Sequence, residues 1–252
     1  MPEHFNPVER LGRSTGALVL TCEHASNALP PWLCAAEGDS SWLQSHWGWD
    51  IGAADLTRAL AELTKADAIL SRFSRLVCDP NRSPRDPTWI RHAVEGHHLG
   101  FNHQMPSNER QRRQEVLHRP YHEAIDQLLT DHDHRHAGGF LLLSVHSFTA
   151  NYMGENRALE AGVLFDDHPT LAVAFMNGLR LQGLDTRLNE PYSGLAGMIH
   201  AVSRHGGQHG VRYLELEVRN DLIDTEDKAR GVARRIARAL SGIAFRAPAS
   251  EL

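Results

Sequence analysis

Imidazole and carboxylate side chains stand at or near the ends of short apolar segments in this sequence. Glu23 and His24 follow ALVLTC, His146 ends FLLLSVH, and Glu217 lies near the end of YLELEV. Two imidazoles and one carboxylate form a common ligand set for catalytic zinc, which keeps an open position for water. A further carboxylate beside the ion takes the proton from that water. These residue types therefore indicate metal-dependent hydrolysis.

The candidate metal ligands are His24, His146 and one carboxylate. Asp50, in the segment HWGWDIGA, is the first choice for that carboxylate, and Glu23 is the second. Two of these residues have an alternative structural role: Asp50 would cap a helix that begins at Ile51, and His24 would hydrogen-bond a turn. His146 ends a strongly apolar segment, where an unpartnered buried imidazole would cost free energy, so a ligand role explains it best.

Glu217 is the candidate general base, and Arg82 is the candidate clamp for a substrate carboxylate. A guanidinium binds a carboxylate through two parallel N–H donors. The alternatives are ion pairs within the protein. Arg82 would pair with Asp79 or Asp86, which are close to it in the sequence. Glu217 would pair with Arg219, which lies on the same face of the strand.

The segments that carry these residues alternate between strand-like and helix-like patterns. Apolar, partly β-branched runs predict strands at 17–22, 75–79, 140–146, 161–166 and 213–218. Helical periodicity predicts helices at 51–64, 109–129, 169–181 and 225–240, the last with Asp224 as its N-cap. This alternation indicates an α/β protein with a mostly parallel sheet, in which ligands bind beyond the carboxyl ends of the strands.

Length and composition narrow the class of protein. A chain of 252 residues with 41% hydrophobic residues buries a full core as one domain, which we expect to span 1–252. It has neither a long uncharged apolar run nor a signal-like start, so we expect a cytoplasmic protein without a membrane partner. The formal net charge of −5 disfavours a nucleic-acid partner. Three cysteines without paired spacing disfavour a disulfide scaffold, and a homo-oligomer is compatible with this composition.

Seven segments carry a resemblance to a known family. They are LTCEHASNALP, HWGWDIGA, SRLVCDPNRSP, RPYHEAI, LLLSVHSFT, NEPYSG and LEVRNDLI, which occur in this order over residues 17–224. In these segments the sequence resembles the N-formylglutamate amidohydrolase family, a relative of the zinc carboxypeptidases and the aspartoacylases. The resemblance implies a three-layer α/β/α, phosphorylase/hydrolase-like fold with one zinc ion. It also implies hydrolysis of a linear amide C–N bond, which gives formate and glutamate in histidine degradation.

The resemblance also implies roles for individual residues. His24 and His146 correspond to the two histidine ligands, whereas Asn27 stands where the carboxypeptidase-like relatives have a glutamate ligand. We therefore expect Asp50 to supply the missing carboxylate. Glu217 corresponds to the catalytic glutamate. The residues implied to bind the substrate, a small acidic N-acyl amino acid, are Asn81, Arg82, His122, Asn189, Tyr192 and Ser193.

Three other readings of the sequence stay open. A non-catalytic module would bind a metal or an acidic metabolite without turnover, but such a module would not need Glu217. A deacylase or carboxypeptidase would act on another acyl amino acid or a peptide, in a pocket that the irregular segment 83–106 would shape. A serine hydrolase finds weak support in HGGQHG at 205–210, which is similar to a glycine-rich oxyanion loop but is not accompanied by a G-x-S-x-G motif.

Overall fold

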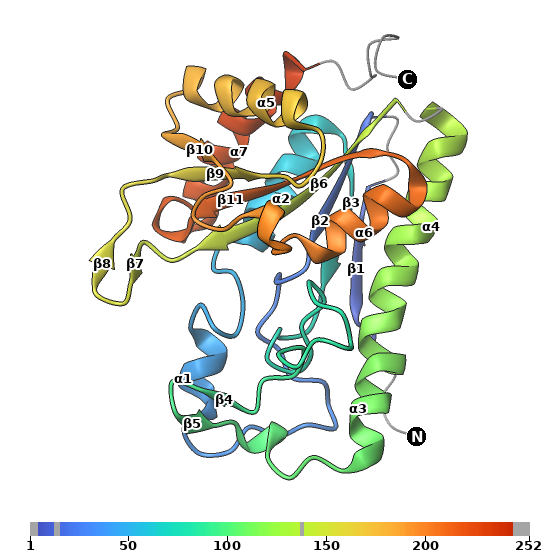
Figure 1. The fold of residues 1–252 in the computed structure, drawn as a ribbon, viewed down its shortest axis with the longest axis vertical. Coiled ribbons are helices and arrows are strands. Elements are labelled where there is room, and N and C mark those ends of the chain that lie inside the picture. Colours follow the sequence, from blue (N-terminus) through green and yellow to red (C-terminus); the bar gives the residue numbers. More distant parts are fainter. Residues whose placement is uncertain (1–4, 13–15, 137–138, 244–252) are drawn as a thin grey trace.

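A sheet of seven strands forms the centre of the protein (Figure 1). The computed structural model describes residues 5–12, 16–136 and 139–243. In spatial order the strands are β1 (Val8–Leu11), β3 (Asp67–Ser71), β2 (Leu18–Cys22), β6 (Leu141–Phe148), β11 (Arg212–Arg219), β9 (Ala161–Leu164) and β10 (Thr186–Leu188). β3, β2, β6 and β11 are parallel neighbours, as are β9 and β10. β1 is antiparallel to β3, and β9 is antiparallel to β11, so the sheet is mixed and mostly parallel, as predicted.

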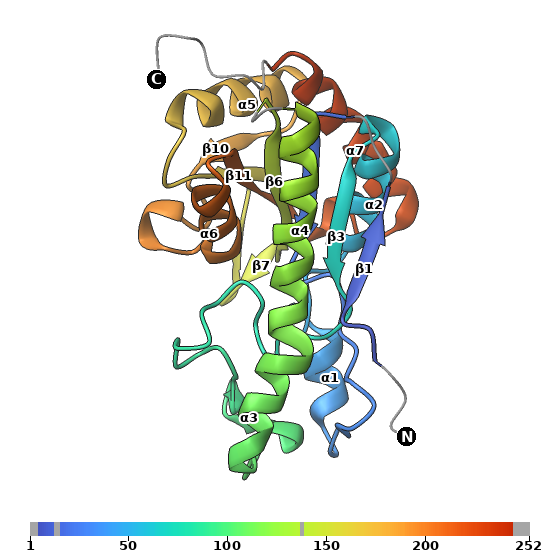
Figure 2. The same cartoon turned by 90° about the vertical axis from the view of Figure 1, so that its right-hand side faces the viewer.

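Helices cover both faces of this sheet, as Figures 1 and 2 show. α2 (Ala53–Thr64), α5 (Pro169–Leu181) and α7 (Glu226–Ser241) pack on one face, and α4 (Arg119–His136) and α6 (His200–His209) pack on the other. The central strand β6 has apolar residues on both of its faces because alternate residues point to opposite sides of the sheet and helices cover both sides. Leu143 and Val145 lie in the core with α2 and α7, and Leu142 lies in the core with α4. The α/β/α arrangement is confirmed.

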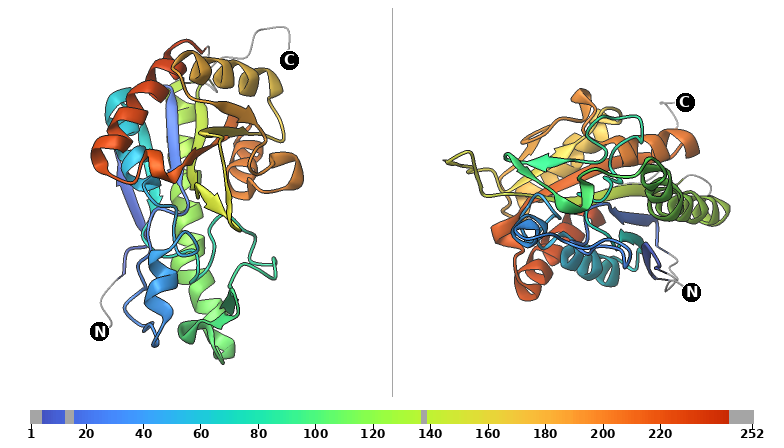
Figure 3. Two further views of the ribbon diagram at one scale, coloured as in Figure 1. Left: turned by 90° about the vertical axis from the view of Figure 1, so that its left-hand side faces the viewer. Right: turned by 90° about the horizontal axis from the view of Figure 1, so that it is seen from below.

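A group of short elements, which we call the lower lobe, extends beyond the carboxyl ends of the parallel strands (Figure 3). It contains α1 (Asp39–Gln44), β4 (Ala93–Val94), β5 (His97–His98), the 3-10 turn η1 (Gly100–Asn102) and α3 (Ser107–Arg113). Its own apolar core includes the buried Leu76 and Trp89. The buried guanidinium of Arg113 fixes the irregular backbone, because it donates to the carbonyls of Val77 and Phe101 at 2.8 and 2.7 Å.

The remaining elements are short. They are the hairpin strands β7 (Asn151–Tyr152) and β8 (Glu155–Asn156), the π-helical turn η2 (Gln114–His118), and the 3-10 turns η3 (Gly194–Ala196) and η4 (Asn220–Leu222). Among the helices in the described ranges, none combines the length and apolar character that a membrane span requires.

One predicted strand is wrong. Residues 75–77 form a turn, 78–79 have no regular structure, and the nearby strand β3, which ends at Ser71, was not predicted. The run is apolar because Leu76, Val77 and Cys78 are buried in the core of the lower lobe, not in the sheet. The backbone of this run forms hydrogen bonds with other loops. For example, the amide of Arg75 donates to the carbonyl of Gly48 at 3.2 Å.

The helices agree better with the sequence. α5 has the predicted bounds, whereas the helix predicted at 109–129 is interrupted by the π-helical turn η2 between α3 and α4. The N-cap of α7 is Thr225, whose side chain accepts from the amide of Lys228, so the prediction of Asp224 at this position is wrong. Asp224 instead pairs with Nζ of Lys228 at 2.7 Å. The segment HGGQHG lies largely within α6 and does not form a loop.

Gly52 provides a test of how the loop before α2 is positioned. Its φ is +81°, and an added Cβ would collide with the backbone oxygen of Ile223. We expect Gly52→Ala to lower the free energy of unfolding by more than about 1 kcal/mol, because both the φ angle and the contact oppose a side chain. Urea denaturation measures this change. The matched control is Gly231→Ala within α7, where a Cβ meets nothing within 4 Å and alanine should stabilise by about 0.5–1 kcal/mol. Equal effects at both positions would contradict the prediction.

Candidate active site

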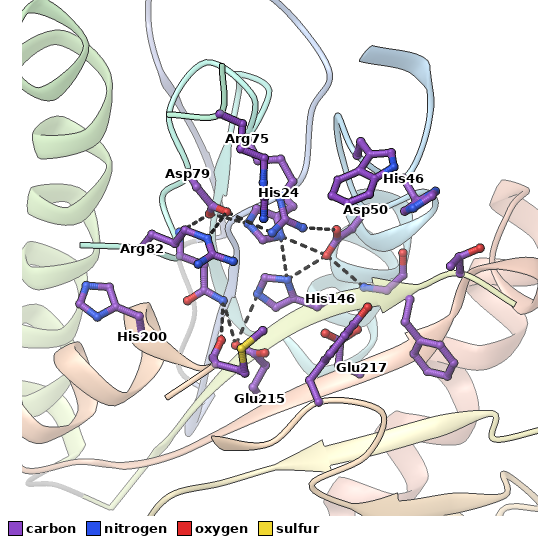
Figure 4. A pocket seen from close by; sticks show the side chains of 18 of the residues that line it. His24, His46, Asp50, Arg75, Asp79, Arg82, His146, His200, Glu215 and Glu217 are labelled. Carbon is purple, nitrogen blue, oxygen red and sulfur yellow. Dashed lines mark hydrogen bonds and ion pairs between the residues drawn. The ribbon is translucent and has the colours of Figure 1, made fainter. Parts of the chain in front are cut away.

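Three side chains converge at the carboxyl ends of the central strands (Figure 4). His24 follows β2, His146 lies near the end of β6, and Asp50 stands shortly before α2. His146 Nδ1 lies 3.1 Å from His24 Nδ1 and 2.8 Å from Asp50 Oδ2, and the last atom lies 3.3 Å from His24 Nδ1. One potential ligand atom of each residue lies within 4.8 Å of the others, and all three residues are buried. The structure thus brings the three predicted ligands together.

Backbone contacts hold Asp50 in place. Its amide donates to the carbonyl of His24 at 3.0 Å, and its Oδ2 accepts from the amide of Ser147 at 3.2 Å. The N-cap of α2 is Gly52, and no side-chain hydrogen bond caps this helix. The helix-cap alternative for Asp50 is therefore wrong, and its carboxylate faces the two imidazoles instead.

A further carboxylate holds the other nitrogen of each imidazole ring. His24 Nε2 lies 2.8 Å from Asp79 Oδ1, and His146 Nε2 lies 3.0 Å from Glu23 Oε2. Glu23 therefore contacts the edge of the His146 ring that faces away from Asp50. Carboxylate partners of this kind fix the tautomer and the orientation of histidines that bind metals.

The buried carboxylates create a site that favours positive charge. Burial opposes ionisation of Glu23, yet hydrogen bonds from His146 and Ser144 hold its pKa at about 2. Burial also opposes the charged form of Asp50, but the two nearby imidazoles hold its pKa below the usual range. Burial disfavours a proton on His146, but the charge of Glu215 and hydrogen bonds to Asp50 and Glu23 raise its pKa well above the usual value. A cation between these donors would be stabilised by the same negative charges.

Glu217 faces these three side chains from the neighbouring strand. It lies opposite His146 in the parallel register of β11 and β6. Its Oε2 atom is buried and has no hydrogen-bond partner in the part of the chain that the structure describes. Burial raises the pKa of Glu217 well above its usual value. Arg219, the partner that the sequence suggested for Glu217, instead donates from Nε to Asp221 at 2.7 Å. Glu217 lines the cavity.

These groups line a cavity of about 340 Å³, a volume within the usual range for small-molecule sites. The predicted site residues that line it are His24, Asp50, Asn81, Arg82, His146, Tyr192 and Glu217. Asn81, one of the residues predicted to bind the substrate, already makes hydrogen bonds within the protein. Asn81 Oδ1 accepts from the amide of Ala201 at 2.8 Å, and its Nδ2 lies 3.4 Å from Glu215.

Arg82 makes both of the ion pairs that the sequence suggested as alternatives. Its Nε lies 3.2 Å from Asp79 Oδ2, and its Nη1 lies 3.5 Å from Asp86 Oδ2. The side chain lines the cavity at the same time. Two of its donor nitrogens are thus engaged, and Nη2 remains for a ligand.

Two residues of the NEPYSG segment lie away from the cavity lining. Asn189 Oδ1 accepts from the amides of Phe165 and Gly194, each at 3.0 Å, so the side chain organises the loop. Ser193 is the N-cap residue of η3. Tyr192, which stands between them in the sequence, does line the cavity. Cζ of Arg157 lies 5.6 Å from the centroid of the Tyr192 ring.

His122, predicted to bind substrate, belongs instead to a buried chain of imidazoles. His118 Nε2 lies 3.0 Å from the carbonyl oxygen of Arg82 and 3.1 Å from His122 Nε2. His122 Nδ1 lies 2.7 Å from His205 Nε2, and His205 Nδ1 lies 2.7 Å from Asp126 Oδ1. With His118 donating from Nε2 and the other two rings donating from Nδ1, each contact has a donor, and the single Nε2–H of His118 is shared between the carbonyl oxygen of Arg82 and His122 Nε2. The chain therefore anchors the backbone of Arg82.

Neutral rings suit this arrangement. Burial lowers the pKa of His118 to about 4. Burial and the neighbouring imidazoles lower the pKa of His122 well below its usual value. Both rings are therefore uncharged near neutral pH, as the tautomer assignment requires.

Sequence reasoning missed several residues that line the cavity. They include His46, Trp47, Arg75, Arg91, Tyr152 and His200. Arg75 bridges two of the acidic groups of the site, since its guanidinium lies 3.4 Å from Asp50 and 3.0 Å from Asp79. Arg75 begins the apolar run at 75–79, which we predicted to be a strand, so the sequence did not indicate a role for Arg75 in the site. The signal that was available is the number of arginines between 75 and 91.

The sequence matches the model of the N-formylglutamate amidohydrolase family over residues 16–224. This chain belongs to that family. The gene product Atu2144 of Agrobacterium tumefaciens is 31% identical, and its structure matches with a TM-score of 0.84 over 94% of this chain and 96% of that chain. The N-formylglutamate amidohydrolase of Ralstonia eutropha JMP134 shares the fold, with 19% identity, a TM-score of 0.73, and coverage of 92% and 95%. No protein with a curated description matches this sequence.

Membership in the N-formylglutamate amidohydrolase family identifies the chain as a hydrolase of amide bonds. The resemblance noted in the sequence is confirmed, and so is the fold class. The family match covers every segment on which the resemblance was based, from β2 to the end of η4.

The geometry predicts how metal binding responds to substitution. We expect His146→Ala to abolish stoichiometric binding of a divalent ion, because it removes one of three converging donors. Glu23→Gln should keep the ion but weaken its affinity by about 10- to 100-fold, since it removes only the outer partner of His146. Elemental analysis and competition with a chelator measure both effects. The control is His103→Ala, at an exposed histidine. Full metal content in His146→Ala would contradict the assignment.

Proposed function

We propose that this protein is a zinc-dependent amidohydrolase that removes an N-acyl group, the formyl group, from an acidic amino acid such as N-formylglutamate. The observation that carries the proposal is the convergence of His24, Asp50 and His146 beside the unpartnered carboxylate of Glu217. Family membership supports the same reaction class. A step in histidine degradation and a cytoplasmic location stay predictions.

The residues present fit one divalent ion. Two imidazole nitrogens and one carboxylate oxygen match the ligand number and types of a catalytic zinc site, and outer carboxylates hold both rings. The high pKa of His146 in its free state reflects negative charge that a cation would balance. A bound zinc ion supplies Lewis-acid chemistry, since it acidifies water and polarises the scissile carbonyl.

Glu217 is proposed as the group that moves the proton. Its unpartnered Oε2 can accept a proton from the attacking water and then donate that proton to the leaving amine of the amino acid. A general base works best when its pKa is near the working pH. Burial holds the pKa of Glu217 high, and a nearby divalent cation would lower it toward that range.

Arg82 and Asn81 are proposed to orient the substrate. Arg82 offers Nη2 from a guanidinium that Asp79 and Asp86 already hold in place. The amide of Asn81 is fixed by its contacts with Ala201 and Glu215. Side chains that are positioned before the substrate arrives lose less conformational freedom on binding, which favours tight recognition.

The central test is hydrolysis of N-formylglutamate, followed as released formate, with zinc-loaded and chelator-treated protein. We expect activity only in the zinc-loaded protein. Glu217→Gln should retain one zinc per chain and lose about 10²–10⁴-fold in kcat, the usual contribution of a positioned acid–base group. Parallel assays with N-acetyl, N-succinyl and peptide substrates test the alternative acyl groups.

The outcomes of this test separate the rival functions. If zinc binds stoichiometrically and no N-acyl amino acid is cleaved, a non-catalytic binding module becomes the better description. If Glu217→Gln keeps full activity, another group must move the proton. Activity that survives complete removal of the metal would overturn the zinc mechanism.

The imidazole chain gives a separate prediction about substrate affinity. We expect His118→Leu to raise KM for N-formylglutamate by about 3- to 10-fold, because the carbonyl of Arg82 loses a buried donor and the loop loosens. The kcat should change by less than about twofold, since the ligands and Glu217 are untouched. His118→Gln, whose amide can donate to the same carbonyl, should restore KM. A loss confined to kcat, or equal KM values in both variants, would contradict a positioning role.

A further inference from the structure

Three arginine side chains line the cavity, and two of them already have acidic partners. Arg75 contacts Asp50 and Asp79 at 3.4 and 3.0 Å. Arg82 contacts Asp79 and Asp86 at 3.2 and 3.5 Å. The carboxylates of the protein thus largely balance these two cations before any substrate binds.

Arg91 differs from both. It lines the same cavity, but its guanidinium has no ion pair and no hydrogen bond with any residue in the described ranges of the chain. Its guanidinium lies over the face of Trp47, with Cζ 5.4 Å from the ring centroid. A guanidinium carries five N–H donors, and those of Arg91 are all available to a ligand.

The environment of Arg91 favours an anion beside it. Burial, followed by the positive charges of Arg82 and Arg75, lowers its pKa below the usual value. A half-buried cation close to two like charges is electrostatically unfavourable, and an anionic ligand would relieve that repulsion. The free protein therefore carries in this cavity a guanidinium that, within the described residues, feels the charges of Asp79 and Asp86 but forms no direct ion pair with either.

The backbone at Arg91 is held firmly although it lies in the irregular segment 83–106. Its carbonyl accepts from Nδ2 of the buried Asn102 at 2.6 Å. The same Nδ2 donates to the carbonyl of Leu76 at 2.8 Å, and Arg113 donates to the side-chain oxygen of Asn102. The base of the side chain is thus fixed by the core of the lower lobe, and the guanidinium lies over the ring of Trp47.

We propose that Arg91 is a specificity-determining residue that binds one of the two carboxylates of the acidic substrate through its full N–H fork. This inference rests on the proposed function and deepens it. Arg82 already directs its Nε–H and one Nη1–H at protein carboxylates, so the cavity contains one partly engaged and one fully available guanidinium. A substrate with two carboxylates matches two such cations.

The experiment compares N-formylglutamate with its two half-amides, N-formylglutamine and N-formylisoglutamine, in which one carboxylate is neutral. Arg91→Ala should lower kcat/KM for the diacid by about 10- to 100-fold, as for loss of hydrogen bonds to a charged group. With one of the half-amides the substitution should change kcat/KM by less than about twofold, because its carboxylate partner is absent. Arg91→Lys should give an intermediate loss, since it keeps the charge but not the fork.

Arg85→Ala is the matched control, because it removes the same charge from an exposed position on the same segment outside the cavity. It should leave kcat/KM unchanged for all three substrates. Equal losses with the diacid and both half-amides in Arg91→Ala, or no loss at all, would overturn the proposal. Thermal unfolding of each variant shows whether the fold is retained.

A binding measurement separates this inference from the proposed function. Calorimetry of glutarate, a dicarboxylate without an amide bond, with zinc-loaded protein does not depend on turnover. We expect Arg91→Ala to weaken glutarate binding by about 10-fold or more and Arg85→Ala to leave it unchanged. If the native protein cleaves none of the three amides but shows this pattern, the proposed reaction fails and the role of Arg91 stands. If glutarate binds equally to the native protein and to Arg91→Ala, the role of Arg91 fails.

Discussion

The contact of one buried carboxylate with two imidazoles is the interaction on which the site depends. Asp50 Oδ2 lies within 3.3 Å of both His24 and His146 and also accepts from the amide of Ser147. Three segments that are far apart in the sequence therefore meet at one oxygen atom. A buried carboxylate without such partners would carry a large desolvation penalty, so burial and pairing must occur together. The same negative charge that binds the imidazoles favours positive charge at this position.

Much of this site could be predicted because strand ends are readable in a sequence. In a parallel sheet, His24 after β2 and His146 at the end of β6 must come near the same edge. The strand period also places Glu217 on a definite face of β11. These inferences needed only local patterns and one rule of topology. The apolar run at 75–79 misled the prediction because burial in a loop core gives the same composition as burial in a sheet.

The parts that could not be predicted depend on tertiary contacts. Asn189 and His122 stand in segments typical of the family, yet one organises a turn and the other belongs to a buried imidazole chain. Membership of a motif does not say whether a polar side chain faces a cavity or bonds its own backbone. Arg91 lies in a segment without periodicity, so its position follows only from the contacts of Asn102 and Arg113 in the lower lobe.

The register between β6 and β11 has a consequence for how the protein can evolve. Glu217 and His146 are paired by the ladder itself, and a slip of one residue would turn Glu217 to the opposite face of the sheet. The same slip would turn Glu215 and Glu217 into the apolar core that Leu214, Leu216 and Val218 now fill, so it is opposed by the cost of burying unpartnered carboxylates there. Mutations that misalign this pair of strands are thus removed as folding defects before they can act as functional ones. The fold and the alignment of Glu217 with His146 are therefore inherited together.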